Sequence, residues 1–576
     1  MRFTITFKDR TANNWELSRI NDETVSMTES MHNDMTKIPL RPVLCKLFDQ
    51  DVFDYIDETT VTIINSPIRT IRHLPGVLML EHNKIYGKIK RKYYYRFVPN
   101  NPQIPTFLVP FLNKKIGFDK YLKNKYALIA FDNWESKHPI GRLVQMIGDV
   151  DELSNFHEYQ LHCKQLHISL REFTVKSHSF LKDHSEEECI EMIQKQYTLH
   201  DRRAVPVYTI DPEHSTDFDD AFSLQFTDAG NSILSIYIAN VPLWMDVMEL
   251  WDSFSKRVST IYLPNKKCPM LPSILSDSLC SLQQKKTRFA FGIDIHLSPE
   301  CEIQSVHFVN SMIQVKRNYV YESSGLLRNP MYKNLFDTVI KMNAHKHYID
   351  HLNDSHDVIA FLMICMNNLC AIEMASRKIG LFRTVKYSIS QECETSVPKS
   401  IRNFIKVWNS SGGKYVSFDA CESHDALNLD QYVHITSPIR RLVDLLNMIQ
   451  LQSSFGLIDK HLLARQTFSD KWTTDESLEF INHKMCATRR VQNDCAILAL
   501  CVKDTTILSR IFNGYVIECE KKACGTYKHT IYLPELKLIR TYTSDAALRL
   551  HGSRDYKLFL FKNEDNVKQK IMIDVV

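Results

Sequence analysis

Four aspartates lie close together between Tyr208 and Phe222, and they are the residues of this chain best suited to chemistry. Counted from Asp211, the residues Asp217, Asp219 and Asp220 follow at offsets of 6, 8 and 9, and Glu213 adds a fifth carboxylate. No lysine or arginine occurs between Arg203 and Lys256, so water or a bound cation must screen the negative charge. Oxygen-only ligands suit hard cations, so the stretch predicts an Mg2+ site, with Mn2+ as the alternative.

The residues around this stretch predict how the carboxylates are positioned. Residues 205–210 are a short β-type run, and Pro212 ends it directly after Asp211. A buried strand would therefore end in one carboxylate, and a loop would return the other three to the same place. A solvated turn is the alternative, but apolar neighbours such as Phe218 and Phe222 favour a metal site. A helix-loop-helix calcium site is excluded, because the required glycine and glutamate are missing at the sixth and twelfth positions.

Four blocks of the chain, in order, resemble the signature segments of the ribonuclease II and ribonuclease R superfamily, whose shared domain is named RNB. The first block is the aspartate stretch, and its Ile210-Asp211-Pro212 start is similar to that of eukaryotic exosome-type nucleases. The other blocks are residues 262–282, the predicted helix around Asn367 that ends in Gly380-Leu-Phe-Arg383, and residues 424–441. The resemblance implies an α+β multidomain protein, in which small OB-type or cold-shock-type β-barrels flank a central mixed α/β RNB catalytic domain.

The same resemblance implies an activity. Members of the superfamily are 3′→5′ exoribonucleases that hydrolyse single-stranded RNA to nucleoside 5′-monophosphates with Mg2+. By this resemblance Asp211, Asp217 and Asp220 hold the metal. Asp219 and Arg440 are the catalytic pair: Asp219 binds the metal or orients the attacking water, and Arg440 steadies the scissile phosphate. A catalytically inactive RNB-fold protein that binds RNA is the alternative function.

Two tyrosines are expected RNA contacts on the same grounds. Tyr262 begins the Tyr-Leu-Pro element, where relatives clamp the last bases of the strand, although a core tyrosine is the alternative. Tyr321 follows Lys316 and Arg317 and is similar to a further family element.

The segment from Thr436 predicts an anion site without reference to the family. Ser437 suits a helix N-cap and Pro438 suits the first helical position, after which apolar residues recur at helical spacing. Arg440 and Arg441 would then fall in the first turn, where the helix dipole disfavours cations. An RNA phosphate is therefore their predicted partner.

Two positions depart from the family pattern. Asn240 stands where relatives carry aspartate after an alanine, and Gln492 stands where relatives carry glutamate. Both departures leave the inactive alternative open.

Positive charge is concentrated toward the N-terminus. From Arg69 to Lys125 there are thirteen lysines and arginines against two acidic residues, although the whole chain carries only +4. Tyrosines interleave with these cations, which predicts a small barrel that binds phosphates and stacks bases. Its candidate RNA contacts are Lys90, Arg91 and Tyr94.

The sequence predicts six parts. They are an N-terminal extension of unassigned structure (1–65), a first cold-shock or OB-type barrel (66–112), a second one (113–180), a linker helix (181–205), the RNB catalytic domain (206–508) and a C-terminal OB-type barrel (509–576).

Composition narrows the remaining function classes. Fifteen scattered cysteines without a CxxC spacing favour reduced thiols in an intracellular, cytoplasmic protein. Only 15 glycines and no glycine-rich phosphate loop argue against a nucleotide cofactor. No signal peptide is expected, and without 18 consecutive apolar residues neither is a membrane partner. Single-stranded RNA is the predicted partner, and protein partners are left open.

Overall fold

The computed structural model describes most of the chain. The described residues are 1–20, 38–81, 85–89, 92–111, 122–227, 230–387, 397–409, 413–459, 461–522, 525–562 and 569–576. They form two compact units, one made of residues 1–167 with 493–576 and the other of residues 168–492. The predicted RNA contacts Lys90 and Arg91 lie outside the described residues.

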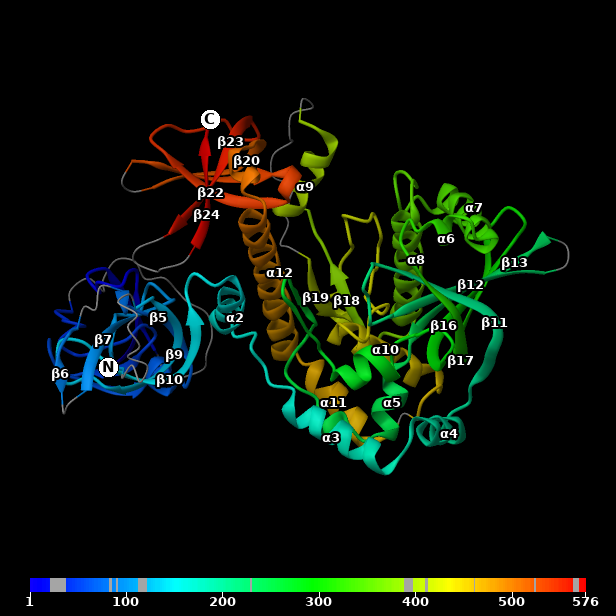
Figure 1. The fold of residues 1–576 in the computed structure, drawn as a ribbon, viewed down its shortest axis with the longest axis horizontal. Helices are drawn as coiled ribbons and strands as arrows, with labels where there is room; N and C mark the ends of the chain where they lie inside the picture. The colour runs from blue at the N-terminus through cyan, green and yellow to red at the C-terminus, as the bar shows by residue number, and fades with distance from the viewer. Residues whose placement is uncertain are drawn as a thin grey trace. The chain divides into compact units, whose positions relative to one another are not determined.

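A closed five-stranded barrel is the centre of the unit formed by residues 168–492 (Figure 1). Its strands, in spatial order, are β11 (His200–Asp211), β12 (Asp220–Phe226), β13 (Ser232–Ala239), β16 (Thr287–Leu297) and β17 (Ile303–Val320). Strand β17 runs parallel to β11, and every other neighbouring pair is antiparallel. The predicted strand that ends at Asp211 is confirmed.

Both faces of the barrel strands are covered, which explains why their sequences alternate only weakly. In β13, Ile236 and Ile238 belong to a core shared with helices α7 (Pro330–Lys346) and α8 (Ser355–Ser376). The intervening Tyr237 belongs to a second core, shared with α5 (Val241–Val247) and α10 (Leu442–Phe455). Apolar side chains on both faces of the barrel strands therefore pack against helices.

Helix α8 is long and apolar enough to cross a membrane by length and composition alone. The mean hydropathy of its most apolar window is 1.9, and 61% of that window is buried inside the protein. A core helix passes the same test, and α8 carries core residues such as Phe361 and Met366.

This unit contains further helices and short strands. They are α3 (Arg171–Asp183), α4 (Glu186–Gln196), β14 (Ile261–Leu263), β15 (Lys266–Cys268), a π-helical turn (Leu275–Leu279), α6 (Ser324–Leu327), β18 (Leu381–Thr384), α9 (Lys399–Asn409), β19 (Lys414–Ser417) and α11 (Leu463–Trp472). The predicted linker helix is α4, and Ser185 caps it through a capping box with Glu188. The long helix α12 (Asp475–Lys503) follows α11.

The helix predicted to start at Ser437 starts later. Helix α10 begins at Leu442, and Arg441 is its N-cap residue with an extended backbone. The backbone N–H groups of Arg440 and Arg441 both donate to the Ser437 carbonyl, so residues 438–440 form a turn. The N–H of Ile439 donates to Asp219 instead of entering a helical ladder. The prediction of two arginines in the first helical turn is therefore wrong, and the helix-dipole argument does not apply to them.

The N-terminal part of the other unit contains two sheets. Residues 1–65, whose structure the sequence left unassigned, hold an antiparallel sheet of order β2-β1-β3-β4. Its strands are β1 (Arg2–Phe7), β2 (Trp15–Arg19), β3 (Val52–Tyr55) and β4 (Val61–Asn65). The Phe48 ring, between β2 and β3, stacks on Phe107 at 5.8 Å, which joins this part to the next sheet.

Residues 74–149 form one six-stranded sheet of order β5-β9-β10-β8-β7-β6. Its strands are β5 (Leu74–Leu78), β6 (Lys88–Ile89), β7 (Lys92–Pro99), β8 (Phe107–Pro110), β9 (Lys125–Asn133) and β10 (Ile140–Asp149); α1 (Pro67–Thr70) precedes them and α2 (Leu153–Cys163) follows. The predicted division into two barrels at residue 112 is wrong, because strands from both sides of it pair in this sheet, β5 with β9 and β8 with β10.

The C-terminal residues form an antiparallel sheet of order β22-β21-β20-β23-β24. Its strands are β20 (Ile511–Lys521), β21 (Tyr527–Leu533), β22 (Leu538–Ser544), β23 (Ser553–Lys562) and β24 (Gln569–Val575). These five strands lie within residues 509–576, the part predicted to be an OB-type barrel.

Candidate active site

Asp211 and Asp220 lie at one end of the barrel because neighbouring strands end and begin there. Asp211 is the last residue of β11, and Asp220 is the first residue of β12. The two strands are antiparallel, with Tyr208 opposite Phe222, so the chain leaves and re-enters the barrel at the same rim. The Tyr321 N–H donates to the Asp211 carbonyl at 3.1 Å and closes the barrel there.

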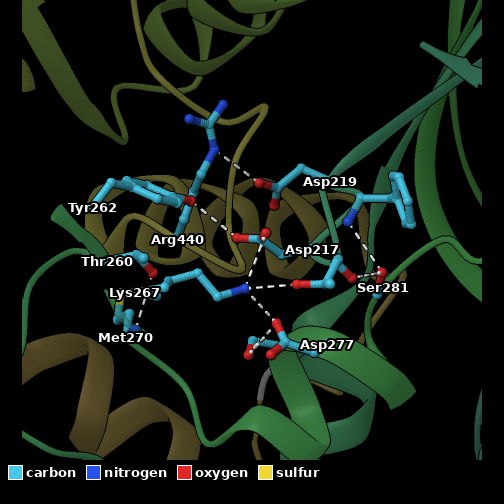
Figure 2. Close-up of polar contacts among 12 residues, drawn as sticks. Asp217, Asp219, Thr260, Tyr262, Lys267, Met270, Asp277, Ser281 and Arg440 are labelled. Carbon is cyan, nitrogen blue, oxygen red and sulfur yellow. Dashed lines mark hydrogen bonds and ion pairs between the residues drawn. The ribbon is translucent and has the colours of Figure 1, made fainter. Parts of the chain in front are cut away.

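The loop between these strands is held by Ser281. Its hydroxyl accepts a hydrogen bond from the Phe218 N–H at 3.0 Å and donates to the Thr216 carbonyl at 2.8 Å (Figure 2). The Leu282 N–H donates to the Phe218 carbonyl at 3.0 Å. The segment Leu279-Cys-Ser-Leu282 therefore fixes the loop that carries Asp217 and Asp219.

Asp219 is buried and both of its oxygens are engaged. Oδ1 accepts from the Ile439 N–H and Oδ2 accepts from Arg440 Nε, each at 3.0 Å. The Asp219 side chain is 3% exposed and that of Arg440 is 45% exposed. In Figure 2 the terminal nitrogens of Arg440 point away from Asp217. Asp219 thus fixes one edge of the guanidinium, and within the described part of the chain the terminal nitrogens of Arg440 have no hydrogen-bond partner, so they can donate to a ligand.

Asp217 is held by two residues of one hairpin. Tyr262 and Lys267 are opposite each other in the β14–β15 pair. The Tyr262 hydroxyl donates to Asp217 Oδ2 at 3.0 Å, and Lys267 Nζ donates to Oδ1 at 3.2 Å. The same ammonium group donates to Asp277 Oδ1 at 2.6 Å, so Lys267 lies between two carboxylates (Figure 2).

Asp211 and Asp220 differ from the other two aspartates in their hydrogen bonding. Among the described residues, Asp211 Oδ2 and Asp220 Oδ2 are buried side-chain atoms that no hydrogen-bond donor reaches. An unpaired buried carboxylate oxygen is costly unless a cation or a proton satisfies it. An all-oxygen pair of this kind fits Mg2+ or Mn2+, so these residues suit the predicted metal.

Burial shifts the protonation of this cluster. It raises the pKa of Asp219 to about 7, although the charge of Arg440 and the hydrogen bond from Ile439 act in the opposite direction. The pKa values of Asp211 and Asp220 are also raised, mainly by burial; the charge of Asp219 adds to the shift of Asp211, and the charge of Asp211 adds to that of Asp220. Without a cation the site therefore retains protons near neutral pH, and a bound divalent cation would displace them.

Comparison with known proteins assigns the region around this site. The family model described as "RNB domain" matches residues 199–329 and 327–455, which include all four aspartates and Arg440. This match identifies residues 199–455 as an RNB domain. A second model, "Dis3-like cold-shock domain 2 (CSD2)", matches residues 94–158, across the predicted boundary at residue 112.

Curated relatives of the RNB domain are nucleases. Ribonuclease R of Chlamydia muridarum is 27% identical over 330 residues, which are 45% of this chain and 48% of the relative. The exosome complex exonuclease RRP44 of Mus musculus is 27% identical over 241 residues, 41% of this chain and 24% of the relative. The chain thus spans about half the length, or less, of these two relatives.

Solved structures share the fold at low identity. Mycoplasma genitalium RNase R, in complex with ribose-methylated single-stranded RNA, matches with a TM-score of 0.68 at 15% identity and 100% coverage of both chains. Yeast Ssd1, described as a pseudonuclease, matches with a TM-score of 0.57 at 14% identity, over 86% of this chain and 68% of Ssd1.

The two departures from the RNB pattern have structural partners. The Asn240 amide is fully buried and exchanges hydrogen bonds with Gln452 and Asn310, at 2.9 to 3.3 Å. The Gln492 side-chain oxygen accepts the Tyr262 N–H at 3.0 Å. Asn240 thus belongs to a neutral amide network, and Gln492 holds the hairpin that carries Tyr262.

The predicted RNA contacts of the RNB domain differ in their surroundings. Tyr262 is 41% exposed, which does not fit the alternative of a core residue. Tyr321 is half-buried and stacks on His356, with ring centroids 3.8 Å apart. Arg441 is paired with the fully buried Asp444 at 2.8 Å, so its charge is balanced within the protein. Outside the domain, Tyr94 lies half-buried in β7.

Sequence reasoning missed Lys267, Asp277 and Ser281. The signal for Lys267 was a short hairpin: a β-type run through Tyr262, a two-residue Pro-Asn turn, and a second run that starts at Lys266. That pattern places Tyr262 and Lys267 on one face, but it does not show that the face meets Asp217.

Replacing Lys267 with methionine should tighten divalent-cation binding. Burial alone would lower the pKa of Lys267, but bonds to Asp277 and Asp217 raise it, so the residue stays charged beside the acidic site. Removing one cation within several ångströms should strengthen Mn2+ binding by about 1–2 kcal/mol, roughly tenfold. Mn2+ titration of Lys267→Met measures this, with the exposed Lys256→Met as control. Equal affinities in both variants would contradict the expectation.

Proposed function

We propose that this protein is a 3′→5′ exoribonuclease that hydrolyses single-stranded RNA to nucleoside 5′-monophosphates with Mg2+, or alternatively Mn2+. One observation carries the proposal: Asp211 and Asp220 present two buried oxygens that no donor of the described residues reaches, beside an arginine fixed by Asp219. The names of the curated relatives, ribonuclease R and exosome exonucleases, support the same activity.

Each site residue has a role in this reaction. A divalent cation, when bound, would activate water and stabilise the charge that develops on the phosphate. Asp211 and Asp220 would hold that cation. Asp219 positions Arg440 through Nε, which leaves the terminal nitrogens of Arg440 to donate to the scissile phosphate. We keep Asp217 as a proposed ligand, with Tyr262 and Lys267 fixing its carboxylate.

An inactive RNA-binding protein is the rival. The description of yeast Ssd1 as a pseudonuclease means that the fold alone does not decide between the two functions. Two features of the site favour hydrolysis. The four aspartates and Arg440 are all present at the barrel rim, and Asn240 is held in an amide network, so its neutral side chain has a structural reason.

The test is direct. RNA labelled at its 5′ end is incubated with the full chain and Mg2+, and the products are followed over time. Progressive shortening from the 3′ end supports the proposal, and the same reaction with EDTA should stop. RNA that is bound but not shortened with either Mg2+ or Mn2+ would favour the inactive alternative.

Tyr262→Ala should lengthen the final product without stopping hydrolysis. A stacked base contributes about 1–3 kcal/mol, which matters most when only a few nucleotides remain bound. The final product should therefore dissociate earlier and accumulate several nucleotides longer. Tyr262→Phe is the matched control, because it keeps the ring and loses only the bond to Asp217. A product of wild-type length from Tyr262→Ala, together with a lower melting temperature, would instead show a core role for this ring.

A further inference from the structure

A second group of metal-ligating side chains lies at the C-terminal end of α2, in the unit that contains residues 1–167. Glu158 and His162 are one helical turn apart, and His167 follows the helix. His162 Nε2 lies 3.7 Å and His167 Nε2 lies 3.3 Å from Glu158 Oε1. The ligand atoms of all three residues lie within 4.8 Å of one another.

The backbone fixes this arrangement. The Leu166 N–H donates to the Leu161 carbonyl at 2.7 Å, and Gln165 between them has a φ of 53°. This bond pattern and the left-handed residue close the helix and reverse the chain. Leu166 is 3% exposed and anchors the turn. As a result the ring of His167 returns over that of His162, with ring centroids 4.2 Å apart.

The surroundings leave one side of the group accessible. The side chains of His162, Glu158 and His167 are 8%, 22% and 47% exposed, in that order. On the same helix, Tyr159 is fully buried and stacks on Tyr126 of β9 at 4.2 Å, which attaches α2 to the sheet. The group therefore has a rigid base and one open face.

We propose that Glu158, His162 and His167 bind a transition-metal cation, with Zn2+ as the preferred ion and solvent in the remaining position. Two imidazoles and one carboxylate are a ligand set that zinc takes in proteins, and the hard cation Mg2+ does not favour it. Ligands about 2.0–2.2 Å from a tetrahedral zinc are about 3.4 Å from each other. Two of the separations, 3.3 and 3.7 Å, lie near that value, and the third is at most 4.8 Å. The exposed His167 ring, stacked on His162 at an interplanar angle of 19°, would turn to direct its lone pair at the ion.

A metal here would have a structural consequence. The ion would join two residues of α2 to the segment after it, and binding only the folded form would stabilise this end of the helix. The ligands are distinct from the aspartates of the RNB domain, so the proposal does not depend on RNA hydrolysis.

Metal titration of the full chain tests the proposal. The starting protein carries Asp211→Asn and Asp220→Asn, so that the acidic site does not contribute. We expect one equivalent of Zn2+ to bind, to raise the melting temperature, and to be replaced by Co2+ with the visible absorption of a tetrahedral nitrogen–oxygen site. Adding His162→Gln or His167→Gln should weaken Zn2+ binding at least tenfold, whereas the exposed His178→Gln should not.

Three outcomes would overturn the proposal. The first is the absence of Zn2+ binding at micromolar concentration while the protein is folded by circular dichroism. The second is binding that both histidine variants retain, which would place the ion elsewhere. The third is equal binding of Mg2+ and Zn2+, which imidazole ligands do not allow. Each of these would leave Glu158 as an ordinary hydrogen-bonding partner of two histidines.

Discussion

Asp220→Asn should slow RNA hydrolysis by at least about a hundredfold and leave RNA affinity within a few-fold of wild type. Asp220 Oδ2, like Asp211 Oδ2, is a buried oxygen that accepts no hydrogen bond from the described residues, so the substitution removes a charge from the proposed cation site. RNA affinity should persist, because cations remote from that oxygen supply most of it. Single-turnover rates with 5′-labelled RNA and Mg2+ measure the first effect, and RNA titration without metal measures the second.

Asp201→Asn is the matched control for this experiment. Asp201 is an exposed residue in the same strand β11, and it pairs with Arg203 at 2.7 Å on the surface. Its substitution removes the same charge away from the barrel rim and should leave both rate and affinity unchanged. If Asp220→Asn retained a rate within a few-fold of wild type, the cation would not lie at Asp220.

Metal-free protein should lose stability as the pH rises from about 4 to about 7, and Mg2+ should restore it. Burial raises the pKa of Asp219 to about 7, and the pKa values of Asp211 and Asp220 are raised too. In the unfolded chain these carboxyls titrate near pH 4, so across this window the folded form holds protons that unfolding releases. A rising pH therefore favours unfolding, and one such shift corresponds to a few kcal/mol.

The measurement compares melting temperatures of wild type and Asp220→Asn in EDTA between pH 4 and pH 8. Other titrating groups affect both proteins equally, so the difference isolates the aspartate pair. The melting temperature of Asp220→Asn should rise relative to that of wild type as the pH rises. Adding Mg2+ should stabilise the wild type alone. Parallel curves, without a Mg2+ effect on wild type, would mean that Asp220 keeps an ordinary pKa in the folded protein.

The segment from Ser437 matches the family motif, but the helix start predicted there from capping propensities is wrong. Capping propensities placed the helix start at Ser437, and the prediction of an anion site followed from a helix dipole. In the structure Asp219 takes the Ile439 N–H from 220 residues away, and α10 starts only at Leu442. The carboxylate of Asp219 accepts this N–H in place of the predicted cap Ser437, because a buried acceptor needs a hydrogen-bond donor. Arg440 still lies at the site, but the reason is its ion pair with Asp219.

The sequence by itself determined the four aspartates, the strand that ends at Asp211, a linker helix between residues 181 and 205 and the resemblance to the RNB domain. These depend on residue types a few positions apart along the chain, where periodicity, proline and capping act directly. The tertiary structure alone decided that Asp211 and Asp220 keep open oxygens while Asp217 and Asp219 are held by Lys267, Tyr262 and Arg440. It also decided that strands on both sides of residue 112 form one sheet. Such contacts join segments tens to hundreds of residues apart. No local sequence pattern predicts which side chain contacts which oxygen.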